Sequence, residues 1–71
     1  MKYFKEDLIK ELKTEIGMRY GVYTRKVARG EMTEDEKEIK INHMRLVKEM
    51  IELTSEGNIG IARGRLELPN E

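Results

Sequence analysis

Apolar side chains recur at steps of three and four residues through the first third of the chain. This spacing places them on one stripe of a helix with 3.6 residues per turn, and charged side chains fill the positions between them. The pattern predicts a helix over about residues 4–28. Glycines at positions 17 and 21 each cost a helix interior about 1 kcal/mol relative to alanine, which leaves open a bend near residues 17–24. The stripe consists of Phe4, Leu8, Ile9, Leu12, Ile16, Tyr20, Tyr23 and Val27.

A second periodic segment predicts a helix over about residues 34–55. Its apolar positions form two neighbouring rows, which together cover nearly half of the helix circumference. The first row is Ile39, His43, Leu46, Met50 and Leu53, and the second is Met44, Val47 and Ile51.

The joint between the two periodic segments carries a stop signal followed by a start signal. Gly30 suits the left-handed conformation that closes a helix, because it has no Cβ. Thr33 and Glu36 have the spacing of a capping box, in which each side chain accepts a hydrogen bond from the other's backbone N–H. Acidic residues at 34–36 complement the positive end of the helix dipole. These signals predict an antiparallel helical hairpin over residues 1–56.

The C-terminal segment, residues 57–71, differs in character, with glycines at 57, 60 and 64 and an apolar alternation at 66–68. Two interpretations remain open. The segment forms a short β-hairpin that turns at Arg63-Gly64, or it is a tail that orders only on contact. The predicted fold is therefore all-α, an antiparallel helical hairpin with an irregular or weakly β C-terminal segment.

Wide apolar stripes on both helices predict self-association, because a two-helix hairpin covers only one side of each stripe. Either residues 57–71 or a second copy must supply the missing surface. We favour a homodimer in which two hairpins form a four-helix bundle, and an unidentified protein partner remains an alternative. The predicted self-association stripe consists of Leu8, Leu12, Ile16, Tyr23, Leu46, Val47, Met50 and Ile51.

Composition adds several exclusions. A chain of 71 residues makes one small domain, and it has no cysteine for disulfides or thiolate–metal sites. No apolar run approaches the roughly 18 residues of a membrane span. The first residues are charged, unlike the apolar stretch of a signal peptide. We therefore expect a cytoplasmic protein that does not insert into membranes.

Basic and acidic residues balance at 14 each, but they are unevenly distributed. Residues 17–30 contain four cations and no acid, and an acidic stretch follows. One explanation is the helix dipole, since cations suit a helix C-terminus and acids suit the next helix N-terminus. The alternative is a nucleic-acid-binding patch, in which tyrosines lie among the cations. The residues that would contact nucleic acid are Arg19, Arg25, Lys26, Arg29, Arg63 and Arg65.

Catalytic and metal-binding patterns are absent from the sequence. His43 is the only histidine, and with no cysteine or second histidine beside it we interpret it as a packing residue. The acids at 31–38 lack the glycine and alternating ligands of a calcium loop. No phosphate-binding glycine loop or nucleophile motif occurs. We expect no catalytic residue, no metal and no cofactor, and a non-enzymatic interaction or assembly module.

One part of the chain resembles a known group. Residues 19–36, with Met44 downstream, resemble the core R-x-x-V-Y-P-R-x-V-x-x-G-x-M-T-x-x-E of small uncharacterised proteins encoded by bacteriophages and prophages. The match covers about a third of the chain, which has Thr24 where the group has proline. The resemblance implies an accessory protein of a phage or prophage and no particular reaction.

Overall fold

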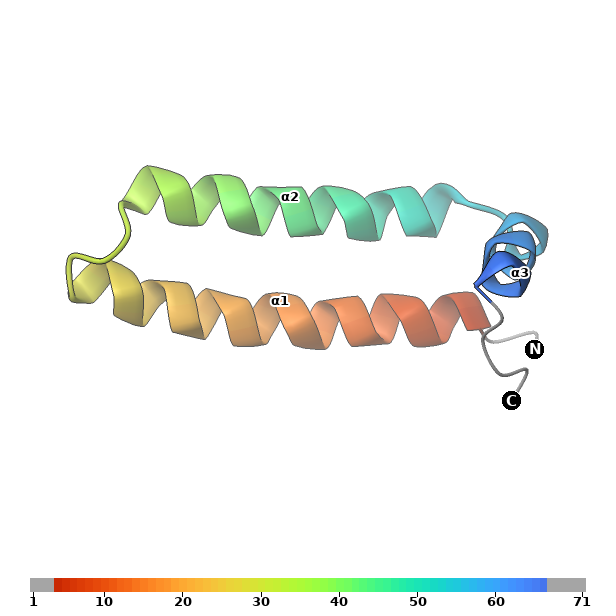
Figure 1. Cartoon of the computed structure of the whole chain (residues 1–71), viewed down its shortest axis with the longest axis horizontal. Helices are drawn as coiled ribbons and strands as arrows, with labels where there is room; N and C mark the ends of the chain where they lie inside the picture. Colours follow the sequence, from red (N-terminus) through yellow and green to blue (C-terminus); the bar gives the residue numbers. More distant parts are fainter. Residues whose placement is uncertain (1–3, 67–71) are drawn as a thin grey trace.

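The computed structural model describes residues 4–66, which form three helices (Figure 1). Helix α1 spans Phe4–Ala28, α2 spans Glu34–Leu53 and α3 spans Glu56–Arg65. The two long helices lie antiparallel along most of their length, and α3 lies at the open end of the hairpin. The all-α fold predicted from the sequence is confirmed for the described residues.

Helix α1 continues through Gly17 and Gly21 without a break. A Cβ added at Gly17 would meet no atom within 4 Å, and one at Gly21 would be 3.7 Å from the Arg25 guanidinium. Neither glycine therefore marks a close approach of another backbone. The bend that the glycines left open near residues 17–24 does not interrupt the helix, because one continuous apolar stripe packs α1 against α2.

The joint between α1 and α2 has the capping geometry that the sequence indicates. Gly30 has a φ of 75°, and its N–H donates to the Val27 carbonyl at 3.0 Å while the Glu31 N–H donates to the Lys26 carbonyl at 2.8 Å. These two bonds make a Schellman motif, which satisfies carbonyls left over at the helix end.

The capping box follows directly. Glu36 N–H donates to the Thr33 hydroxyl at 3.0 Å, and Thr33 N–H donates to the Glu36 carboxylate at 3.1 Å. The stop and start signals therefore lie within a few residues of each other, which turns the chain back on itself.

The C-terminal segment is where the sequence prediction is wrong. Residues 56–65 form helix α3 rather than a tail or a β-hairpin turning at Arg63-Gly64, while the rest of the predicted hairpin, from residue 67, lies outside the described residues. Ser55 caps this helix, since its hydroxyl accepts a hydrogen bond from the Asn58 N–H at 3.2 Å. Three glycines oppose a helix here by about 1 kcal/mol each, so contacts with α1 must offset them.

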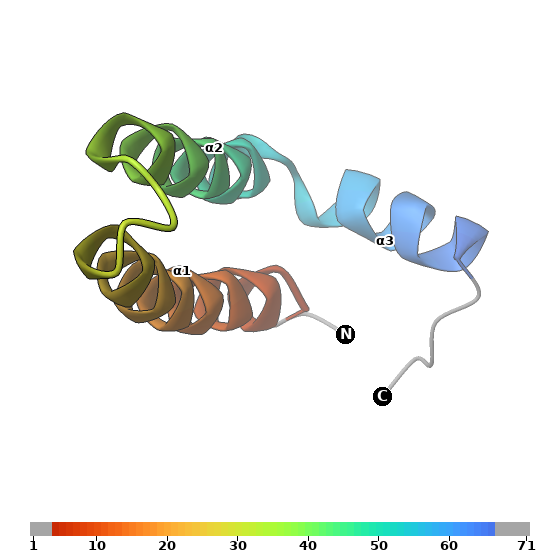
Figure 2. The same cartoon turned by 60° about the vertical axis from the view of Figure 1, so that its left-hand side comes forward.

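Those contacts join α3 to the start of α1. Figure 2 shows α3 at the end of the hairpin where α1 begins. Ile59 and Arg63, one helical turn apart, are the buried residues of α3. The Arg63 guanidinium lies 4.2 Å from the centre of the Phe4 ring. The Glu56 carboxylate accepts a hydrogen bond from the Lys5 N–H at 2.8 Å, which satisfies one of the orphan donors at the N-terminus of α1. Helix α3 thus covers the beginning of α1.

The hydrophobic core of the described chain is small and the molecule is elongated. Ile41 and Ile59 are its only buried apolar residues. The radius of gyration is 15.1 Å, against about 11 Å for a compact domain of this length. The accessible surface is 5579 Å², against about 4,600 Å² for a compact monomer of the same mass. A single copy therefore leaves much of its surface uncovered.

Candidate protein-interaction surface

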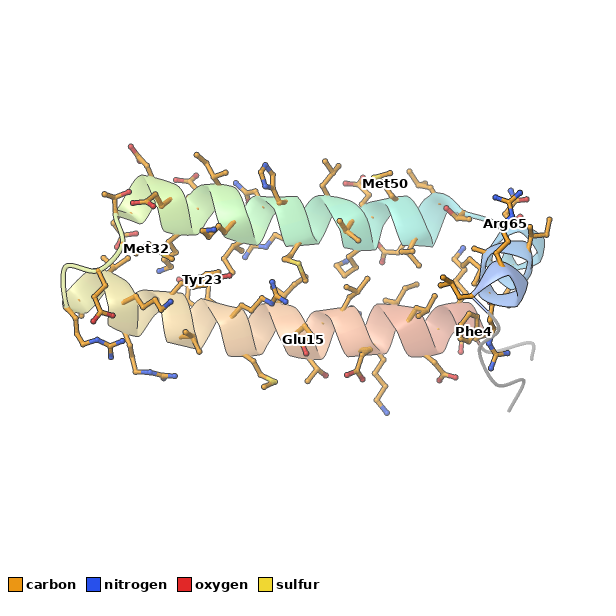
Figure 3. The ribbon with its side chains drawn as sticks, viewed as in Figure 1. Phe4, Glu15, Tyr23, Met32, Met50 and Arg65 are labelled. Carbon is orange, nitrogen blue, oxygen red and sulfur yellow. The ribbon has the colours of Figure 1, made fainter. Side chains whose placement is uncertain are left out.

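One side of α2 carries a row of exposed apolar side chains. We call it the outer face of α2, and it consists of Ile39, His43, Leu46, Val47, Met50 and Leu53. Its apolar members are between 44% and 82% exposed. Figure 3 shows Met50 pointing away from α1, whereas Tyr23 of α1 lies between the two helices. Soluble monomers rarely expose such continuous apolar rows.

The opposite side of α2 packs on α1. Ile41 is buried at its centre, and Met44, Lys48 and Ile51 are half-buried along the same side. At 3.6 residues per turn, this side and the outer face are about 160° apart. Helix α2 therefore has two apolar sides, and among residues 4–66 only one of them has a partner.

This arrangement corrects the sequence interpretation of α2. The sequence predicts one wide face from the two rows, but Met44 and Ile51 point inward while the row from Ile39 to Leu53 points outward. The predicted rows do not include Ile41, which is the most deeply buried residue of the helix. Its spacing of three residues to Met44 and ten to Ile51 is the signal that would have found it, because it continues their side of the helix.

The residues predicted to mediate self-association fall into two groups. Within the hairpin, half-buried between α1 and α2, lie Leu8, Leu12, Ile16, Tyr23 and Ile51. On the exposed outer face lie Leu46, Val47 and Met50. The first group holds the chain's own hairpin together, so only the second group is available to another molecule.

The six candidate nucleic-acid residues do not form one patch. Arg25, Lys26 and Arg29 lie at the closed end of the hairpin, whereas Arg63 and Arg65 lie on α3 at the open end (Figure 1). The long axis of the molecule extends 43 Å. Arg63 is buried against α1, and Arg65 is exposed. Arg19 pairs with Glu15 one turn earlier at 3.6 Å.

Arg29 is engaged at the joint itself. Its guanidinium donates a hydrogen bond to the Glu31 carboxylate at 2.9 Å. This hydrogen bond, together with the charge of the guanidinium, lowers the pKa of Glu31, and the same contact raises the pKa of Arg29. Both side chains are about half exposed. Arg29 therefore forms its ion pair within the turn between α1 and α2. Its place near the C-terminus of α1 also suits the helix dipole.

A shallow hollow of about 180 Å³ lies on the flank of α2 beside Tyr20. Lys37 covers the Tyr20 ring, with its Nζ 4.2 Å from the ring centre. Ile41 is one of the residues that line the hollow. The hollow is open to solvent, and its charged residues, Glu34, Glu38, Lys37 and Arg45, carry both signs. Nothing in this lining selects a particular ligand.

The described part of the chain offers few residues for a metal or catalytic site. Among residues 4–66, no group of three or more histidines and acids could hold a metal ion. His43 is exposed on the outer face of α2, not inside the hairpin. Over the same residues, no helix is both long enough and apolar enough to cross a membrane.

Comparisons with known proteins found no match. No protein-family model, curated protein or solved structure matches the chain. The exposed outer face of α2 is thus the main candidate for an interaction surface among the described residues.

Proposed function

We propose that this protein is a non-enzymatic assembly module that associates with a second copy of itself through the outer face of α2. The observation that carries this proposal is the apolar row from Ile39 to Leu53, exposed on the side opposite the one packed on α1. Two hairpins joined in this way would place four long helices side by side, which differs from the four-helix bundle around one core that the sequence predicts.

The small core supports the need for a second copy. Below about 70–80 residues, a single core rarely supplies more than about 3–5 kcal/mol, and small natural proteins add disulfides, metals or oligomerisation. This chain has no cysteine, and its described part has no metal cluster. Its surface exceeds that of a compact monomer by about 1,000 Å², and each partner in a standard interface buries about 800 Å². The excess is thus large enough for one interface.

Helix α1 offers a poorer surface for the second copy. Met18 and Val22 are exposed on its outer side, but the neighbouring turns carry Glu15 and Arg25. An apolar seam on α1 would therefore be interrupted by charges within one turn. The outer face of α2 has no charged residue in its central row.

The biological setting is part of the same proposal. The resemblance of residues 19–36 to small phage and prophage proteins suggests an accessory protein of a mobile element, acting in the cytoplasm. A self-associating helical module of this kind would act through assembly and protein contacts, and it would require no cofactor. The position of the gene among replication, packaging, lysis or regulatory genes would indicate the process that it serves.

A matched pair of substitutions tests the proposal. Met50 on the outer face of α2 is 59% exposed and Met18 on α1 is 61% exposed, so their replacement by glutamate introduces the same charge at equal exposure. Light scattering after size exclusion should give the unmodified chain and Met18→Glu a mass of about twice 8.4 kDa. Met50→Glu should be monomeric. A monomeric unmodified chain at 100 µM would overturn the proposal.

Nucleic-acid binding is the second candidate function. It is favoured by the closed end of the hairpin, where Arg25 is exposed and Lys26 and Arg29 lie within one turn of it. The acids at 34–36 lie at the same end, which weakens attraction for phosphate. We therefore rank this function below self-association.

A further inference from the structure

The outer face of α2 has the spacing of a coiled-coil seam. Its central residues, Ile39, His43, Leu46, Met50 and Leu53, follow one another at steps of four, three, four and three. Such steps define the two core positions of a heptad, at which each side chain fits between four residues of a facing helix. The seam is continuous over two heptads, or about 21 Å of helix. A second copy of the same helix presents the same spacing.

We infer that the outer faces of two α2 helices pack antiparallel, with the twofold axis between His43 and Leu46. This inference rests on the proposed self-association and adds its geometry. In an antiparallel pair, the two kinds of core position face each other. Ile39 then lies opposite Met50 of the second copy, and His43 lies opposite Leu46 of the second copy.

Charge at the helix N-terminus favours this orientation. Glu34, Asp35 and Glu36 form the acidic first turn of α2, and its last turn has no basic residue. In a parallel pair, the two acidic turns would lie side by side, about 8–10 Å apart. In the antiparallel pair they are about 28 Å apart along the axis, well beyond the screening length of about 8 Å in physiological salt. Each acidic first turn then lies beside the last turn of the second copy's α2, whose one charged residue is Glu52, so the repulsion between two acidic first turns arises only in the parallel pair.

The polar members of the seam favour the same orientation. A parallel pair would place His43 against its own copy, and two turns earlier, one turn before Ile39, Glu36 would face Glu36 of the second copy. Like charges or paired polar groups in a seam cost stability. The antiparallel pair places each imidazole against Leu46 and each Glu36 against Leu53 of the second copy, so no polar residue of the seam meets its own copy.

Contacts beside the seam do not reverse this preference. A parallel pair would bring Asp35 near Lys40 of the second copy, but exposed ion pairs contribute at most about 1 kcal/mol. The antiparallel pair instead brings the Asn42 amide near the Glu49 carboxylate of the second copy, where a hydrogen bond can form. The flanking contacts contribute similar free energies in the two orientations. The acidic first turns and the seam residues therefore determine the orientation.

The shape of the assembly follows from the two sides of α2. Because the outer face is about 160° from the side packed on α1, the four long helices would lie in one layer. Their order would be α1, α2, α2 of the second copy and α1 of the second copy. A closed bundle, in which all four helices surround one core, would require neighbouring rather than opposite faces.

Single cysteines test the orientation, since the natural chain has none. Ile39→Cys and Met50→Cys are prepared separately, mixed, and oxidised under mild conditions, and the products are identified by mass. A disulfide requires Cα atoms within about 7 Å. The antiparallel pair predicts mixed disulfides between the two variants and little product from either variant alone. Met18→Cys, on the outer side of α1, should give no disulfide above background.

Other outcomes separate this inference from the proposed function. Efficient disulfides from each variant alone would show a parallel pair and overturn the inference, while self-association would stand. A dimer by light scattering that forms neither product would place the interface elsewhere and would also overturn it. A monomeric unmodified chain would overturn both proposals.

A second measurement leaves the seam unaltered. A nitroxide attached to Asp35→Cys, outside the apolar row, should give a distance between the two labels of about 28 Å or more in the antiparallel pair. A label separation below 20 Å would indicate the parallel pair and contradict the inference, even if the variants at positions 39 and 50 associate poorly.

Discussion

Gly30 determines where the first helix ends, because its backbone adopts a φ of 75° that other residues rarely adopt. Its amide and that of Glu31 satisfy two carbonyls of the last turn of α1. Gly17 is in the opposite situation. It lies within a regular helix, with open space where a Cβ would be. The same residue type thus stabilises the turn at one position and weakens the helix at the other.

Alanine substitutions should therefore have opposite effects at the two glycines. Gly17→Ala should raise the free energy of unfolding by about 1 kcal/mol, through helix propensity. Gly30→Ala should lower it by about 1 kcal/mol, since a left-handed conformation is strained for alanine. Urea unfolding at one fixed protein concentration measures both. Destabilisation by Gly17→Ala would show that α1 is not a regular helix at that position.

The Arg29–Glu31 contact predicts a pH effect at the joint. Because Arg29 lowers the pKa of Glu31, the folded state binds this proton less readily than the unfolded state. The contact therefore contributes stability above the unfolded pKa of about 4.3, and this contribution is lost as pH falls through the lower folded pKa. NMR titration should find the Glu31 carboxyl titrating below its usual range. Arg29→Gln should return it toward that range, and an unchanged titration would contradict the contact.

At the scale of elements, α3 depends on its contact with α1. Its three glycines make an isolated ten-residue helix unfavourable. Ile59 and Arg63 bury one side of it, and Glu56 bonds the first turn of α1. The helix should therefore unfold when it is detached, while α1 and α2 keep their own contacts.

Two isoleucines of α3 allow a matched test. Ile59 is buried and Ile61 is exposed. Ile59→Ala should cost on the order of 2 kcal/mol at the α3 contact and speed hydrogen exchange of the amides in 56–65 at least tenfold. Ile61→Ala should leave this exchange nearly unchanged. Equal protection in both variants would show that docking on α1 does not hold α3.

The elements differ in how far local sequence determines them. The joint was predictable because Gly30, Thr33 and Glu36 act on backbone groups within three residues of themselves. Helix α3 was not, because Gly60 and Gly64 disfavour it locally and its stabilising contacts come from residues more than 50 positions away. Ser55 was the available local signal, since its spacing to Asn58 suits a helix cap. The inward side of α2 was misassigned because two apolar sides occur on one helix.

At the scale of the whole molecule, five of the six candidate nucleic-acid residues are divided between the two ends of the hairpin, and the sixth, Arg19, pairs with Glu15. The distribution predicts that duplex and single-stranded DNA bind negligibly at physiological salt, because a continuous phosphate footprint is missing. Replacing Arg25, Lys26 and Arg29 together with glutamine should reduce stability by roughly 1 kcal/mol through the helix dipole. Fluorescence anisotropy with labelled DNA checks this expectation. Tight, salt-sensitive binding that the triple variant loses would favour the nucleic-acid function.

The candidate surface was only partly predictable at this scale. Leu46, Val47 and Met50 were expected to mediate self-association, and the structure leaves them exposed. Ile16 and Tyr23 were expected to do the same, but they are used within the hairpin. Apolar periodicity indicates which side of a helix is buried. It does not indicate whether the surface that covers this side belongs to the same chain. Only the packed hairpin distinguishes the two groups.

The central claim is that a second copy completes the folded state, and the concentration dependence of thermal unfolding tests it most directly. Association that stabilises only the folded chain makes the midpoint temperature rise with protein concentration. We predict a Tm several degrees higher at 500 µM than at 5 µM for the unmodified chain. The difference should be smaller for Met50→Glu and retained by Met18→Glu. A Tm that is the same at both concentrations, for a chain with the mass of a monomer, would contradict the account.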